Sequence, residues 1–66
     1  MKVIVNGTPQ DIEDGASVET CVRLLTTATT GVAAAVNGEV VRRSSWAQTP
    51  LQDGDLVEVI TAVQGG

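Results

Sequence analysis

The chain has 66 residues, which is enough for one domain and near the size at which a single hydrophobic core is only marginally sufficient. Its composition holds one cysteine and no histidine, which excludes an intrachain disulfide, the usual zinc sites and histidine-assisted nucleophiles. The formal charge of −4 opposes nucleic-acid binding, because phosphates must be neutralised by cationic side chains.

The first predicted element is a β-hairpin at the N-terminus. Residues 2–6 are rich in β-branched side chains, and Asn6-Gly7 is a two-residue turn signal because both residues tolerate positive φ. The return strand is expected over residues 8–12. Pro9 places this strand at an edge of the sheet, since proline has no N–H to donate to a ladder.

One helix is expected next, over residues 18–27. Ser17 is a suitable N-cap, and Glu19 lies in the first turn, where the helix dipole favours a negative charge. The apolar residues at helical spacing are Val18, Cys21, Val22 and Leu25. The threonine-rich stretch that follows weakens helix propensity, and Gly31 ends the segment.

A second hairpin and a final strand complete the predicted elements. Asn37-Gly38 repeats the turn signal between strands expected over residues 32–36 and 39–41. Residues 44–47 are typical of a short helical turn, and a final strand is expected over residues 56–61 after another turn. The order β-β-α-β-β-β predicts the α+β class and the ubiquitin-like β-grasp fold, a mixed four- to five-stranded sheet with one main helix packed across one face.

The final strand predicts one buried and one open face. Glu58 is expected to point outward together with Leu56 and Ile60, which makes these three residues a candidate partner surface. The alternate residues Val57, Val59 and Thr61 are expected to face the helix. We expect residues 1–62 to form the β-grasp domain and residues 63–66 to form a flexible C-terminal tail.

Several side chains that could carry chemistry are expected to have structural roles instead. Cys21 falls in the apolar stripe of the helix, so a buried thiol is favoured over a sulfur relay. Trp46 is expected to shield the edge of the core rather than to anchor a partner. The remaining pairs, Arg42 with Arg43 and Asp53 with Asp55, are interpreted as solvated charges and as turn residues rather than a metal pair.

The sequence favours a protein that is acted upon over an enzyme. A domain of this size rarely has room for both a core and a substrate pocket, and no glycine-rich phosphate loop is present. We therefore expect no catalytic residue, no bound metal and no bound cofactor in this chain. The lack of a signal-like or membrane-spanning apolar segment predicts a cytoplasmic protein with no membrane partner.

The whole sequence resembles the ThiS family, the sulfur carriers of thiamine biosynthesis. The features that carry the resemblance are Val36-Asn37-Gly38, Val41-Arg42-Arg43 with Trp46 just beyond, Asp53-Gly54-Asp55 before the last strand, and Val63-Gln64-Gly65-Gly66 at the end.

The resemblance implies a role for the carboxylate of Gly66. An E1-like adenylyltransferase would activate it with ATP and Mg²⁺, and a persulfide protein would then supply sulfur to give a thiocarboxylate. The resemblance also implies that this sulfur is delivered to thiazole synthase.

Elementary chemistry is consistent with such a tail. An α-carboxylate is ionised at neutral pH and attacks a phosphorus centre once it is positioned. Gly65 and Gly66 lack a Cβ, so they fit a narrow channel, and Val63 and Gln64 are expected to thread with them. Four extended residues span about 13 to 14 Å, which is sufficient to reach a buried site in a partner.

Three alternatives stay open at the level of sequence. A sulfur carrier for molybdopterin or cysteine synthesis would use the same terminal chemistry. A ubiquitin-like modifier would instead join Gly66 to a lysine through an isopeptide bond. A passive β-grasp interaction module would not need Gly65 and Gly66 at all.

Overall fold

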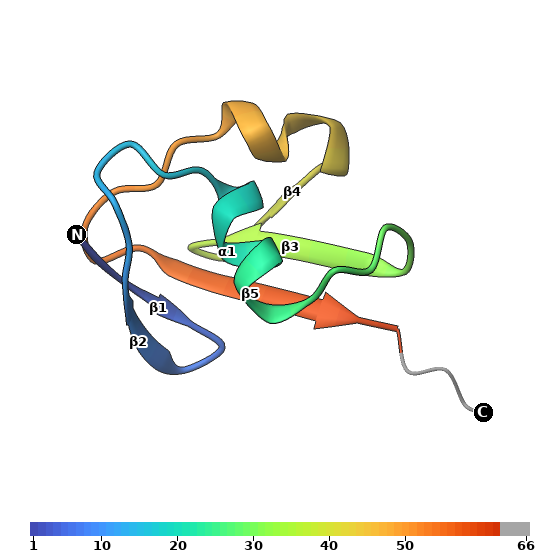
Figure 1. Cartoon of the computed structure of the whole chain (residues 1–66), viewed down its shortest axis with the longest axis horizontal. Helices are drawn as coiled ribbons and strands as arrows, with labels where there is room; N and C mark the ends of the chain where they lie inside the picture. Colours follow the sequence, from blue (N-terminus) through green and yellow to red (C-terminus); the bar gives the residue numbers. More distant parts are fainter. Residues whose placement is uncertain (63–66) are drawn as a thin grey trace.

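The computed structural model describes residues 1–62, and residues 63–66 lie outside the described residues. A five-stranded sheet carries one α-helix and one 3-10 helix (Figure 1). In chain order the elements are β1 (Lys2–Val5), β2 (Thr8–Asp11), α1 (Val18–Leu25), β3 (Val32–Val36), β4 (Glu39–Val41), η1 (Arg43–Gln48) and β5 (Leu56–Thr61). The predicted division between a domain of residues 1–62 and a tail of residues 63–66 therefore stays a prediction.

The strands lie in the order β2-β1-β5-β3-β4, so the last strand in the chain occupies the centre of the sheet. The pairing of β1 with β5 is parallel, and the other three pairings are antiparallel. Pro9 lies on β2 at one edge, as its missing N–H predicts. The mixed sheet and its single α-helix confirm the predicted β-grasp arrangement.

The two Asn-Gly turns have the backbone geometry that the sequence predicts. Asn6 and Asn37 both have φ 51°, and the glycines that follow have φ 82° and 86°. The Asn6 side chain has a further role, because its amide Nδ2 donates to the carbonyl of Val59 at 3.0 Å and its Oδ1 accepts from the Val59 N–H at 2.8 Å. An asparagine in the first turn thus extends the hydrogen bonding of the central strand where β1 has already ended.

Helix α1 is two residues shorter than predicted. At its start the Thr20 hydroxyl accepts from the N–H of the N-cap residue Ser17 at 3.3 Å, which satisfies a backbone donor there. The helix ends at Leu25 because Thr26 has an extended backbone, with φ −156° and ψ 149°. The stripe prediction holds for Val18, Cys21 and Val22, but Leu25 is 46% exposed because the helix stops there, beyond the core.

The core lies between the sheet and the two helices, which cover the same side of it (Figure 1). The buried residues of the core come from the sheet, both helices and the loop after η1: Val3, Val5, Val18, Cys21, Val22, Ala34, Trp46, Leu51, Val57 and Val59. The opposite side of the sheet is not covered by any element within residues 1–62. None of the helices in this part of the chain is long and apolar enough to span a lipid bilayer.

Candidate functional site

Strand β5 has two faces of opposite character, and it runs directly toward residues 63–66. Val57 and Val59 are buried in the core. Leu56, Glu58 and Ile60 are exposed on the other face, as predicted, with Leu56 51% and Ile60 66% accessible. Thr61, predicted to face the helix, is exposed as well.

The sheet register widens this exposed face across two more strands. Ala35 lies opposite Glu58 and Ala33 lies opposite Ile60 on β3, while Val40 of β4 lies opposite Ala35. Val40 is 79% exposed, the highest value among the large hydrophobic side chains of the described chain. We call this surface the open face, made up of Leu56, Glu58, Ile60, Ala33, Ala35 and Val40.

The three residues from β3 and β4 were missed by the sequence analysis. Their signal was the two-residue turn at Asn37-Gly38, which fixes Val36 opposite Glu39 and hence Ala35 opposite Val40. The pairing of β3 with β5 joins residues that are distant in the chain, and no local sequence pattern sets that register. The outcome is an apolar surface around one central carboxylate.

The two aspartates before β5 are turn residues, as predicted. Asp53 accepts a hydrogen bond from the Lys2 N–H at 2.7 Å, and Asp55 accepts from the Gln52 N–H at 2.8 Å. Asp55 also accepts from the Asn37 side-chain amide at 3.0 Å. Within residues 1–62, no cluster of three or more His, Cys, Asp or Glu side chains could hold a metal ion.

Cys21 is buried in the helix stripe, which confirms the prediction of a core thiol. Its burial raises the pKa of the thiol, because the thiolate would have to lose its hydration. The nucleophilic thiolate form is therefore disfavoured. This environment does not suit a sulfur relay.

Trp46 is also a core residue, with 2% of its surface exposed. Its indole N–H donates to the carbonyl of Val41 at 2.9 Å, so the single polar atom of the ring is satisfied. The guanidinium of Arg43 lies 5.9 Å from the ring centroid, within the range of a cation–π contact. Val41 and Arg43 therefore both contact Trp46, and these contacts hold η1 against the core.

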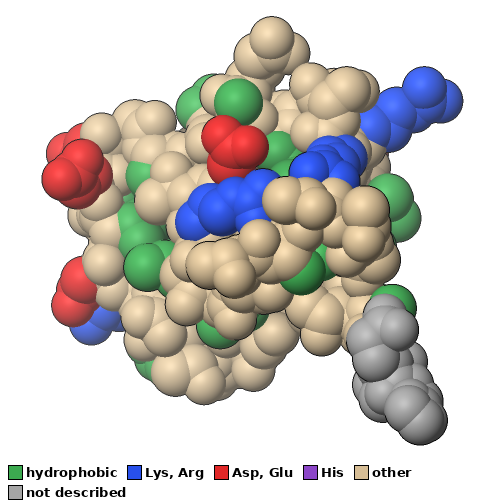
Figure 2. Space-filling view, turned by 45° about the vertical axis from the view of Figure 1, so that its right-hand side comes forward, with side chains coloured by type: hydrophobic (Ala, Val, Ile, Leu, Met, Phe, Trp, Pro, Cys, Tyr) green, Lys and Arg blue, Asp and Glu red, His purple; other side chains and the backbone are tan. Residues whose placement is uncertain are grey.

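Charges are distributed unevenly over the surface. Figure 2 shows acidic side chains at the left edge and near the centre, and basic side chains mainly across the middle and toward the upper right. The ion pairs in the described chain join the N-terminal ammonium to Asp14 at 3.3 Å and Lys2 to Asp11 at 3.9 Å. Arg42 and Arg43 are exposed, in agreement with their interpretation as solvated charges.

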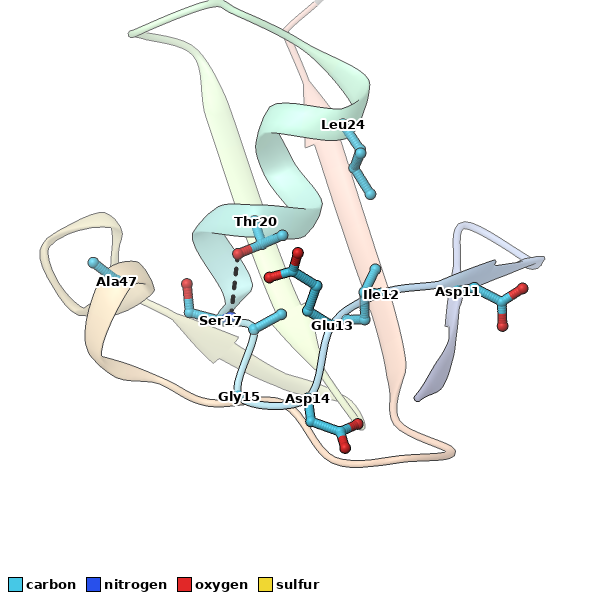
Figure 3. Close-up of a pocket in the computed structure, with 10 residues that line it drawn as sticks. Asp11, Ile12, Glu13, Asp14, Gly15, Ser17, Thr20, Leu24 and Ala47 are labelled. Carbon is cyan, nitrogen blue, oxygen red and sulfur yellow. Dashed lines mark hydrogen bonds between the residues drawn. The ribbon is translucent and has the colours of Figure 1, made fainter.

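A shallow depression near the start of α1 was not anticipated from the sequence (Figure 3). The residues that line it include three acidic side chains, Asp11, Glu13 and Asp14, and two apolar ones, Ile12 and Leu24. In Figure 3 the Asp11 and Asp14 carboxylates point away from the depression. Asp14 pairs with the N-terminal ammonium and Asp11 with Lys2, so the two carboxylates have separate partners. The Glu13 carboxylate points toward Thr20 in the same view (Figure 3).

Comparisons of the sequence and of the structure with known proteins point to one family. The model of the ThiS family matches residues 3–66. The chain belongs to the ThiS family. The sulfur carrier protein ThiS of Escherichia coli (strain K12) is 30% identical over 66 residues, which cover 100% of both chains. The resemblance predicted from the sequence is therefore confirmed.

Three further proteins resemble this chain, one in sequence and two in solved structures. A thiazole synthase of Paramagnetospirillum magneticum is 33% identical over 66 residues, but this chain spans only 20% of that protein. The crystal structure of the thiamine biosynthesis protein ThiS from Geobacter metallireducens superposes with a TM-score of 0.77 at 32% identity, covering 100% of both chains. A solution structure of a thiamine biosynthesis protein from the same organism gives 0.75 at 33% identity, covering 100% of this chain and 88% of the other.

Proposed function

We propose that this protein is a sulfur carrier of thiamine biosynthesis that bears its sulfur on Gly66 and performs no catalysis itself. The observation that carries the proposal is the match to the E. coli sulfur carrier over the full length of both chains, joined to the same fold. The similarity to a segment of a thiazole synthase supports thiazole formation as the destination of the sulfur, in preference to molybdopterin or cysteine synthesis.

The proposed chemistry begins with activation of a carboxylate. An E1-like adenylyltransferase binds ATP and Mg²⁺, and the Gly66 carboxylate attacks the α-phosphate and expels pyrophosphate. The acyl-adenylate that forms is a good acyl donor. The terminal sulfur of a persulfide protein then attacks the acyl carbon and displaces AMP, giving an acyl disulfide.

A thiol completes the sulfur transfer to the carrier. It attacks the S–S bond of the acyl disulfide, forms a disulfide with the donor and releases the Gly66 thiocarboxylate. Thiazole synthase then takes the sulfur, and the carrier returns to the carboxylate form. ATP, Mg²⁺ and the donor thiols all belong to partners in this scheme, so the carrier itself needs no cofactor.

In this proposal the domain contributes a docking surface, and residues 63–66 supply the reach to the reacting atom. We assign docking to the open face, where Leu56 and Ile60 lose apolar surface to a partner and Glu58 selects for a cation opposite it. Residues 63–66 then span about 13 to 14 Å from the end of the sheet to the buried site of the partner. Gly65 and Gly66 admit the chain there because they have no side chain.

Intact-mass spectrometry of the protein purified from its native host tests this function. The proposal predicts a species heavier by one exchange of oxygen for sulfur, localised to the terminal peptide and lost on alkaline or oxidative treatment. Heavier covalent conjugates with other proteins, without any thiocarboxylate, would instead identify a ubiquitin-like modifier. Full biological function after deletion of Gly65 and Gly66 would identify a passive interaction module.

A further inference from the structure

The junction between β5 and residues 63–66 is held by the loop that joins α1 to β3. Strand β5 ends at Thr61, which is paired with Val32 at the start of β3. One residue further along, the N–H of Ala62 donates to the carbonyl of Gly31 at 2.6 Å. Figure 1 shows this green loop beside the end of β5. The antiparallel pairing therefore continues one residue beyond both strands.

Gly31 is suited to this contact because it has no side chain. Its φ is +71°, in the left-handed region, and a Cβ at this position would lie 3.1 Å from the Cβ of Ala62. The other described glycines with positive φ, which are Gly7, Gly15, Gly38 and Gly54, would meet nothing within 4 Å. Gly31 is thus distinguished, among the glycines of residues 1–62, by a close approach as well as by its backbone conformation.

We propose that Gly31 is a positioning residue, which holds Ala62 against the sheet and thereby sets the point from which residues 63–66 begin. This inference rests on the proposed function of Gly66. Four extended residues reach about 13 to 14 Å, so an anchor at Ala62 confines the Gly66 carboxylate to a smaller volume than a free strand end would. Misplacement of reacting groups by about 1 Å can lower a rate by about a hundredfold.

Positioning by Gly31 separates the docking of the domain from the placement of its reacting carboxylate. Docking uses the open face, which lies along β5 before Ala62. Gly31 acts only at the end of that strand. Loss of the Gly31 contact is therefore expected to lower kcat for adenylation while leaving the affinity for the activating partner unchanged.

The principal variant is Gly31→Ala, and Gly15→Ala is its matched control. Both substitutions place a side chain at a positive φ, +71° and +87° respectively, but only the first brings a Cβ as close as 3.1 Å to the Cβ of Ala62. We expect Gly31→Ala to lower kcat for ATP-dependent pyrophosphate exchange with the E1-like partner by about tenfold. Gly15→Ala should retain the wild-type kcat, even where it lowers thermal stability equally.

Two further variants distinguish the contact from a general loss of folding. Ala62→Pro removes the N–H that donates to the Gly31 carbonyl and adds no side chain at Gly31. It is expected to reproduce the fall in kcat. The double variant Gly31→Ala with Ala62→Gly removes the Cβ of residue 62, which the new side chain at position 31 would crowd. It is expected to recover part of the kcat that Gly31→Ala loses. The partner's dissociation constant, measured by calorimetry, should match wild type for all variants.

Amide hydrogen exchange of Ala62 provides a readout that does not depend on the proposed function. We expect the Ala62 amide of the wild type to exchange at least about tenfold more slowly than an unprotected amide. Gly31→Ala should remove this protection, and Gly15→Ala should keep it. An unprotected wild-type Ala62 amide would overturn the proposal, as would an unchanged kcat in a Gly31→Ala protein that had lost the protection. Wild-type protein that supports no pyrophosphate exchange would overturn the proposed function separately.

Discussion

The two faces of β5 differ in burial, although both carry aliphatic side chains. Val57 and Val59 are buried beneath α1, whereas Leu56 and Ile60 lie in solvent on the opposite face of the same strand. All four side chains are aliphatic, so composition does not distinguish them. Their environments do, because α1 and η1 cover only one side of the sheet. Period-two alternation thus lets one strand supply both the core and the surface that we propose for docking.

The two faces are expected to respond to substitution in opposite ways. A change on the covered face should lower the free energy of unfolding, with little direct effect on partner binding. A change on the open face should weaken partner binding and leave the free energy of unfolding nearly constant. The unfolding free energy and the affinity for the partner are therefore the two quantities that separate the faces.

The largest stability effect is expected for Trp46→Ala on the covered side. Removal of this buried ring should cost about 3 to 5 kcal/mol of unfolding free energy, which is comparable with the whole stability of a domain of this size, about 3 to 10 kcal/mol. Urea unfolding followed by circular dichroism measures the change. Arg43→Ala is the control, because it removes only the cation over the ring and should cost about 0.5 to 1 kcal/mol. Equal losses in the two variants would contradict the assignment of Trp46 to the core.

Val57→Ala and Ile60→Ala compare the two faces of β5 directly, because each truncates one aliphatic side chain of the same strand. Val57→Ala should cost about 2 kcal/mol of unfolding free energy, because it removes buried methyl groups and leaves a cavity. Ile60→Ala should change the unfolding free energy by no more than about 0.5 kcal/mol. The same Ile60→Ala protein should bind the E1-like partner about tenfold more weakly in calorimetry. Unchanged binding by Ile60→Ala would remove the docking role from the open face.

Glu58 tests the electrostatic part of docking. Glu58→Lys reverses the central charge of the open face while keeping an exposed, extended side chain. We expect partner association to slow by about threefold to tenfold at low salt, with the difference from wild type shrinking as salt is added. Stopped-flow association at two ionic strengths measures this effect. A faster association at low salt would show that the partner presents an anion here.

The smallest effect is expected for Cys21. Cys21→Ala should cost about 1 kcal/mol at neutral pH and leave thiocarboxylate formation unchanged. Burial raises the pKa of the thiol above its ordinary value of 9.0, so its contribution to stability is complete below that pH and is lost as the pH rises through the folded-state pKa. Urea unfolding at several pH values should therefore show the stability of wild type approaching that of Cys21→Ala in alkali. Abolished sulfur transfer in Cys21→Ala would restore the relay hypothesis.

Most of the fold was predictable because its signals are local. The Asn-Gly turns at residues 6–7 and 37–38 fixed both hairpins, and Ser17 marked the start of α1. The end of α1 was predicted two residues too late, since the weak helix propensity of threonine sets no sharp boundary. The Ala-rich β3 gave no sign of which face was buried, because alanine is compatible with either environment.

The features missed from the sequence depend on contacts between distant residues. The Asn6 side chain pairs with the backbone of Val59, 53 residues away, and no local pattern reports that contact. The close approach of Gly31 to Ala62 is hidden for the same reason, since Gly31 was interpreted only as the end of a helical segment. Of the candidate site, the exposure of Leu56, Glu58 and Ile60 was predicted correctly. The roles assigned to residues 63–66 stay predictions, because these residues lie outside the described structure.

The most direct test of the account is to block the acid group of Gly66. A version of this chain extended by one tryptophan after Gly66 should be expressed in a host that lacks its own carrier, with intact mass confirming that the extension is retained. The account predicts growth without thiamine for the original chain and no growth for the extended one, because the acyl group of Gly66 is then held in an amide and cannot be adenylated. Growth supported by the extended chain would contradict the account.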